Sequence, residues 1–95
     1  MKTFKLFCLL IVILLSSSLL AAKYDKKVNP TKLYEEAVSY LDKEDYRKAQ
    51  RVLKKYTKSK PKDADGWTLY AFTQRKLKKF KQAEEFYAKA LSLDP

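Results

Sequence analysis

Two pairs of adjacent glutamates are the residues of this sequence that come nearest to catalytic groups: Glu35-Glu36 and Glu84-Glu85. Two carboxylates that share a pocket can act as a general acid and a general base. Adjacent residues of a helix face in different directions, however, and Glu85 can instead pair with Lys89 at helical spacing. We therefore predict no catalytic residues and no enzymatic activity.

Metal and thiol chemistry have little support in the composition. The 95 residues include no His, and the single Cys is Cys8, within an apolar N-terminal run. Metal sites built on His or Cys, intrachain disulfides and Cys-His catalysis are therefore excluded. We predict no bound metal and no cofactor.

Lysines and aromatic residues are mixed in two runs, Lys54-Lys55-Tyr56 with Lys58 and Lys78-Lys79-Phe80-Lys81. A nucleic-acid surface can have this composition. The formal net charge is +10, and it would be +8 without residues 1–22. The aromatics fall on stripes that helices bury, so we interpret the lysines as the solvated surface of a basic protein. This argues against nucleic acid as a partner, and anionic lipid or cell-wall polymer stays as an alternative.

The N-terminal segment has the order of a secretory signal peptide. Lys2 and Lys5 precede a continuous apolar run, small residues follow up to Ala22, and charged sequence begins at Lys23. A basic, then apolar, then small-residue order is typical of a cleaved export signal.

We predict that residues 1–22 are such a signal and that residues 23–29 form a linker, which would make the protein periplasmic or secreted. The alternative is an uncleaved anchor in the inner membrane, because residues 4–22 approach the length that a membrane span needs. A membrane is a predicted partner only in that case.

The remaining sequence is one 34-residue unit written almost twice. Residues of related size recur at this spacing, in the pairs Leu33 and Trp67, Ala37 and Ala71, Tyr46 and Phe80, Ala49 and Ala83, Val52 and Phe86, Leu53 and Tyr87, and Pro61 and Pro95. A fixed period of this length is typical of helical solenoid repeats. We predict an all-α fold with repeat units at residues 30–63 and 64–95.

Each unit predicts two helices, with apolar residues every three or four positions. Asn29 and Pro30 can open the first helix, Asp45 can cap the second, and Asp63 can cap the third.

These residues resemble the tetratricopeptide repeat, over residues 30–95. The resemblance rests on large, small and proline residues at fixed places of each unit: Leu33 and Trp67 at the fourth, Ala37 and Ala71 at the eighth, Ala49 and Ala83 at the twentieth, Leu53 and Tyr87 at the twenty-fourth, Ala90 at the twenty-seventh, and Pro61 and Pro95 at the thirty-second. It implies two helix-turn-helix hairpins in a short α-solenoid, where small residues let the helices approach closely.

Three residues depart from the family pattern. Glu36 replaces an expected Leu, Gln74 an expected Tyr, and Tyr56 an expected Ala. We expect Glu36 to leave the first helix poorly buried. We expect Tyr56 either to push the third helix outward or to turn its own ring away.

The resemblance also implies a peptide-binding concave face, formed by the first helix of each unit. The residues carried over to this face are Tyr34, Val38, Asp42, Thr68, Phe72, Arg75 and Lys76. Tyr34, Val38 and Phe72 would supply an apolar and aromatic patch, and Arg75 and Lys76 a positive charge at one end.

The alternative for this face is that Val38 and Leu41 serve the hairpin core, and that Phe72 is only partly exposed and binds nothing. Some family members clamp a C-terminal carboxylate with paired Lys and Asn side chains. The matching places here hold Tyr34 and Val38, then Thr68 and Phe72, so that ligand is not carried over.

The sequence thus predicts an exported, non-catalytic scaffold that binds a protein or peptide. A membrane-tethered assembly or structural module is the alternative. We also expect the last helix to turn Phe86, Ala90 and Leu91 partly toward the place of a third repeat, where self-association or a partner would cover them.

Overall fold

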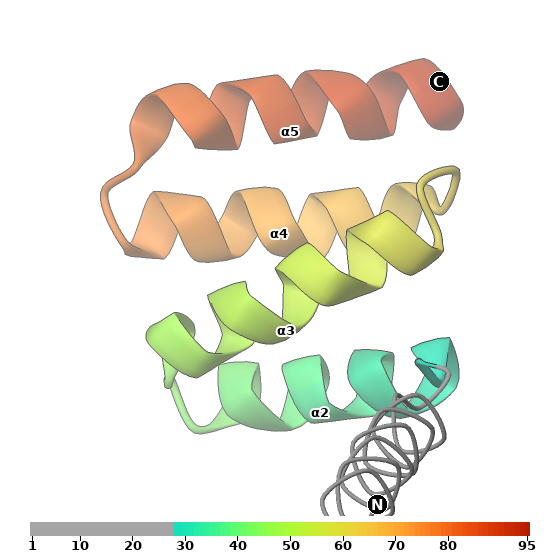
Figure 1. Ribbon diagram of the computed structural model, residues 1–95. Helices are drawn as coiled ribbons and strands as arrows, with labels where there is room; N and C mark the ends of the chain where they lie inside the picture. Colours follow the sequence, from blue (N-terminus) through green and yellow to red (C-terminus); the bar gives the residue numbers. More distant parts are fainter. Residues whose placement is uncertain (1–27) are drawn as a thin grey trace, which may run out of the picture.

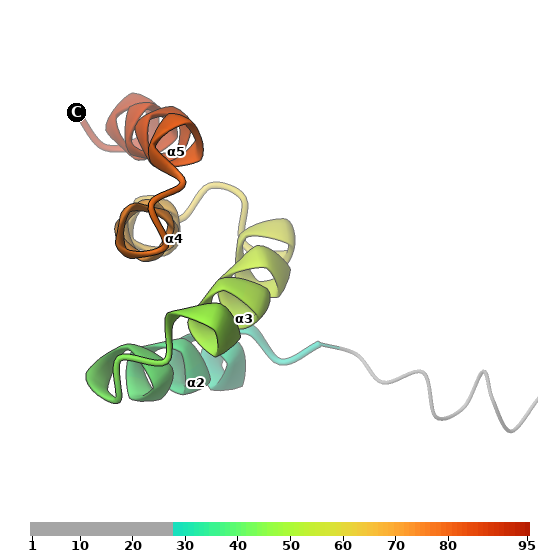
Figure 2. The same cartoon turned by 90° about the vertical axis from the view of Figure 1, so that its left-hand side faces the viewer.

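The computed structural model describes residues 28–95, which form four helices joined by short turns (Figure 1). They are α2 (Pro30–Asp42), α3 (Tyr46–Ser59), α4 (Ala64–Lys76) and α5 (Phe80–Leu93). Each helix packs against the next, so that α2 and α5 lie at the two ends of the stack (Figures 1 and 2). This confirms the predicted fold of two helical hairpins. The predicted signal peptide and residues 23–27 of the predicted linker lie outside the described residues.

Side chains cap three of the helices as the sequence predicts. Asn29 Oδ1 accepts a hydrogen bond from the Lys32 amide at 3.4 Å, and Asp45 Oδ1 accepts one from the Lys48 amide at 3.3 Å. Asp63 Oδ1 accepts from the Asp65 amide at 3.1 Å. Each carboxylate or amide satisfies a backbone N–H that the first helical turn leaves unpaired.

The turn inside each hairpin has the same backbone structure in both repeats. Glu44 and Lys78 are 34 residues apart, and they have positive φ values of 58° and 63°. The amide after each reaches back to close the preceding helix, from Asp45 to the Tyr40 carbonyl and from Lys79 to the Gln74 carbonyl, both at 2.8 Å. Such a left-handed residue followed by a return bond is the Schellman termination of a helix.

The core forms where small residues let the helices approach. Ala37, Ala49, Leu53 and Tyr70 make one buried cluster, to which each of the first three helices contributes. Ala71 is fully enclosed and Ala83 is 4% exposed, as the repeat pattern predicts for these places. Of the α2 residues only Ala37 is buried, and Glu36 is exposed, which confirms that the first helix is the poorly buried one.

Tyr56 adopts an arrangement that the sequence analysis did not anticipate. Its side chain is buried and has not turned away. The ring lies directly on Gly66 of α4, where an added Cβ would be 2.5 Å from Tyr56 Cε1. The tyrosine therefore occupies the space that a side chain on α4 would need, and its hydroxyl donates a hydrogen bond to Asp63 Oδ2.

The last helix also differs in part from expectation. Leu91 is exposed as predicted, but Ala90 is buried, which contradicts the prediction that it faces outward. Phe86 is half-buried, and its ring centroid lies 4.3 Å from that of Tyr70 and 5.4 Å from that of Trp67. Contact with the aromatic side chains of α4 draws Phe86 into the hairpin.

Candidate peptide-binding groove

A recess of about 400 Å³ lies between the first helices of the two hairpins. Four of the seven residues predicted for the concave face line it: Val38, Asp42, Thr68 and Phe72. Leu41, Leu69 and Tyr87 complete the lining. We call this recess the groove.

The groove has an apolar surface whose deeper residues pack against the core. Val38 is 37% and Phe72 is 38% exposed, whereas Leu41 and Leu69 are half-buried and pack against the core. The Phe72 ring meets the Tyr46 ring edge-on, at 6.4 Å between centroids. Tyr46 therefore supports one side of Phe72, and the exposed part of that side chain is available to a ligand. Leu41 thus both packs against the core, as the alternative interpretation expects, and lines the groove together with Val38.

Positive charge lies beside the groove. Lys76 Nζ is 5.5 Å from the centroid of the Phe72 ring, a distance at which a cation interacts with the aromatic face. Arg75 is exposed, and neither Arg75 nor Lys76 lines the recess itself. Lys76 is thus at the edge of the groove, whereas no contact joins Arg75 to a groove residue.

Tyr34 lies in a different recess, of about 390 Å³, near the start of α2. Its ring centroid is 5.3 Å from that of Tyr56, and Asp63 and Asp65 line the same space. Burial raises the pKa of Tyr34, and the charges of Asp65 and Asp63 raise it further. Burial also raises the pKa of Tyr56, with its hydrogen bond to Asp63 as the next cause. Both phenols therefore stay neutral in an electronegative setting, apart from the groove.

Sequence reasoning missed Leu69 and Tyr87 as groove residues. The family pattern assigns Tyr87 to packing between helices. Leu69 lies on α4, but it is not at one of the places that the resemblance gives to the concave face. Tyr87 comes from α5 and nevertheless borders the recess between α2 and α4. Its size was the available signal, because a large ring at a helix crossing can extend past the contact.

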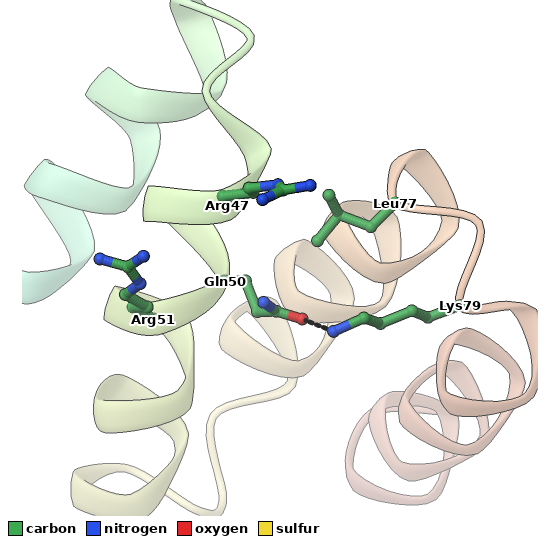
Figure 3. Close-up of a pocket in the computed structure, with 5 residues that line it drawn as sticks. All are labelled: Arg47, Gln50, Arg51, Leu77 and Lys79. Carbon is green, nitrogen blue, oxygen red and sulfur yellow. Dashed lines mark hydrogen bonds between the residues drawn. The ribbon is translucent and has the colours of Figure 1, made fainter.

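A third recess, of about 340 Å³ and with a basic lining, was not predicted. Arg47, Gln50 and Arg51 of α3 line it together with Leu77 and Lys79 from the turn before α5 (Figure 3). Lys79 Nζ donates a hydrogen bond to Gln50 Oε1 at 2.6 Å. We call this recess the basic pocket, and it shares no residue with the groove.

Residues 28–95 contain no group of three or more acidic, His or Cys residues placed to hold a metal ion. None of the four described helices is both long enough and apolar enough to span a bilayer.

A family model described as anaphase-promoting complex, cyclosome, subunit 3 matches residues 13–90, which is more than half of the chain. No curated protein and no solved structure matches the chain significantly.

Proposed function

The chain belongs to the family of anaphase-promoting complex, cyclosome, subunit 3, which is built of tetratricopeptide-like repeats, and we propose that it is a non-catalytic scaffold that binds a peptide segment of another protein in the groove. Repeats of this kind generally bind protein partners.

The exposed pair of Val38 and Phe72 carries this proposal. The two residues come from different hairpins and line one recess, whose other lining residues include Leu41, Leu69 and Tyr87. A recess of about 400 Å³ can accept one large apolar side chain. We therefore expect the ligand to insert an aromatic or aliphatic residue between α2 and α4, as anchored peptides do in other helical grooves.

Selection from a displayed random-peptide library tests this mode of binding. The protein should enrich peptides that share one large apolar residue, and Phe72→Asp or Val38→Asp should lower their affinity at least tenfold. Phe80→Asp is the matched control, because Phe80 is 60% exposed and outside the groove. Equal losses from Phe72→Asp and Phe80→Asp would contradict binding in the groove.

We propose that the scaffold works outside the cytoplasm, after residues 1–22 are removed. The order of basic, apolar and small residues supports this location. N-terminal sequencing of the protein isolated from cells should begin near Lys23. A chain that begins at Met1 and resists carbonate extraction would instead support the alternative, a membrane-tethered assembly module.

Self-association through α5 is a further part of the proposal. Leu91 is 66% exposed, and it borders a recess of about 360 Å³ with Tyr87, Ala90 and Ala64. An exposed apolar side chain beside a recess offers a surface for contact with a second copy of the protein. Sedimentation should show a dimer that Leu91→Asp dissociates and Phe80→Asp leaves intact. A monomer at all concentrations would refute self-association.

A further inference from the structure

The basic pocket combines positive charge with a shape that an exposed lysine run lacks. Its lining holds three cations, Arg47, Arg51 and Lys79, and no carboxylate. Within residues 28–95, Lys48 with Asp45 is the ion pair that the structure forms, at 3.7 Å, so no described carboxylate pairs with the pocket cations. Cations held around a recess without internal compensation favour an external anion.

The side chains in the pocket are arranged as hydrogen-bond donors. The Gln50 amide oxygen already accepts from Lys79 at 2.6 Å, which leaves the Gln50 NH₂ group free to donate (Figure 3). Arg47 reaches from α3 toward Leu77, beside the same recess, whereas the Arg51 guanidinium points away from Lys79 (Figure 3). Arg47, Gln50 and Lys79 therefore form the centre of the pocket, with Arg51 at its rim.

We propose that the basic pocket binds a phosphate dianion, with Arg47 and Lys79 as the charged ligands and the Gln50 amide as a neutral donor. The two central cations match the two negative charges, whereas a carboxylate would neutralise only one of them. A guanidinium fork also fits two phosphate oxygens at once. This site is independent of the groove, since it uses α3 and the turn before α5.

The start of α5 gives a second reason for an anion here. Lys79 is the N-cap residue of this helix and makes no side-chain cap, whereas the other three helices have Asn or Asp in that place. A cation next to the positive end of a helix dipole is unfavourable. A dianion bound to Lys79 would offset that repulsion, so phosphate should stabilise the fold as well as bind to it.

Titration of inorganic phosphate into the full chain, as purified from expressing cells, tests the proposal. Calorimetry at pH 7.5 should show binding that acetate at the same ionic strength does not reproduce, and the melting temperature should rise with phosphate concentration. Arg47→Gln and Lys79→Gln should each weaken binding at least tenfold. Absence of phosphate binding at 10 mM, or equal binding of acetate, would overturn the proposal.

Lys54→Gln is the matched control, because it removes the same charge from an exposed place on the same helix, outside the pocket. It should change phosphate affinity less than twofold. Arg51→Gln should have an effect between those of Arg47→Gln and Lys54→Gln, since Arg51 lies at the rim. A loss as large for Lys54→Gln as for Arg47→Gln would show general attraction to a basic surface and refute a built site.

Gln50→Glu provides a test that leaves all three cations of the pocket in place. The substitution keeps the side-chain shape and places a carboxylate among Arg47, Arg51 and Lys79. It should abolish phosphate binding while the melting temperature stays equal or rises. Loss of binding together with a fall in melting temperature would indicate damage to the fold and would contradict the proposed charge arrangement.

The source of the phosphate is distinguished by vesicles. If the ligand is a lipid headgroup, vesicles with phosphatidic acid should bind the protein more tightly than vesicles with an equal charge of phosphatidylglycerol, and Arg47→Gln should remove the difference. Binding of free phosphate without that preference indicates a soluble phosphate compound. If the protein binds neither the vesicles nor free phosphate, the proposal is refuted. Phe72→Asp should have no effect on either form of binding.

Discussion

The two hairpins share one backbone plan and fill it with different side chains. In both, the inner turn has a residue of positive φ at the same place in the unit, followed by the same backbone hydrogen bond to the preceding helix. The second hairpin then packs three aromatic rings together, from Trp67, Tyr70 and Phe86. The first relies on smaller residues, with Ala37, Ala49 and Leu53 fully enclosed.

This difference shows that the repeat pattern fixes where helices cross but leaves open how the remaining volume is filled. Interiors reach their density through many combinations of side chains of suitable size. Substitutions at equivalent places of the two hairpins can therefore separate what the backbone plan requires from what each packing solution requires.

Enlarging the crossing alanines should have the largest effect. We expect Ala49→Leu to cost about 3 kcal/mol of unfolding free energy, because overpacking a closed core costs about 1–3 kcal/mol or more. Ala49 is fully enclosed in a cluster with residues of α2 and α4, whereas Ala83 is 4% exposed and lies outside that cluster. Ala83→Leu should therefore cost less. Urea unfolding followed by circular dichroism measures both.

The exposed lysines Lys54 and Lys81 supply the controls for the alanine substitutions. Lys54→Ala and Lys81→Ala should change stability by no more than about 0.5 kcal/mol. If Ala83→Leu proved more damaging than Ala49→Leu, the second hairpin would be the more tightly closed one.

Gly66→Ala should have the next largest effect, with a sign that depends on Tyr56. The new Cβ would lie 2.5 Å from the Tyr56 ring, so one of them must move. We expect a net loss of about 2 kcal/mol from overpacking. In a Tyr56→Ala background the same substitution should become stabilising, by up to about 1 kcal/mol, since Ala is the better helix former.

A double-mutant cycle measures this coupling between Tyr56 and Gly66. The second hairpin has no equivalent tyrosine to compare, because Ala90 is at the place of Tyr56. A cycle with no interaction energy would mean that the ring has other space available and does not depend on Gly66.

At Gln74 the second hairpin buries a polar group whose hydrogen bonding is incomplete. The equivalent residue in the first hairpin is Tyr40, which is half-buried. Gln74 is 1% exposed, its amide donates to Gln82 Oε1, and its own Oε1 has no hydrogen-bond partner among the described residues. A buried unpaired acceptor costs about 1–3 kcal/mol.

Gln74→Leu should therefore raise the unfolding free energy by about 1 kcal/mol, a conservative share of that cost. Gln82→Leu is the control, because Gln82 is exposed and should change stability little. Thermal unfolding compares the two variants. Destabilisation by Gln74→Leu would show that the hydrogen bond from its amide to Gln82 outweighs the cost of its unpaired oxygen.

The comparison of the two hairpins also shows which features the sequence could predict. The helices, three caps and the crossing alanines follow from a 34-residue period, because each depends on local spacing and small size. The contact of Tyr56 with Gly66 could not be predicted in the same way, since it joins a departure from the family pattern on α3 to the one glycine of the chain, on α4. The family resemblance predicted Val38 and Phe72 as groove residues. It did not predict Tyr87, because Tyr87 belongs to the second helix of its unit.

The basic pocket has no periodic signature at all. Gln50 and Lys79 are 29 residues apart, a separation that differs from the repeat length, and their hydrogen bond joins different hairpins. Along the sequence, Lys79 belongs to a lysine run that looks only solvated. Its role depends on the turn that brings it beside α3, which only the three-dimensional arrangement reveals.

The inner turns should show the smallest effect and the closest agreement between the hairpins. Glu44 and Lys78 adopt positive φ, where a side chain is disfavoured and glycine is not. Glu44→Gly and Lys78→Gly should each stabilise the fold by about 0.5 kcal/mol, because relief of the left-handed conformation is partly offset by the entropy that glycine loses on folding. Both side chains are exposed, so packing does not enter. Differential scanning calorimetry should give equal upward shifts for the two variants. Unequal shifts would mean that the turns, like the cores, have diverged; equal ones would place the divergence of the hairpins in their side-chain packing alone.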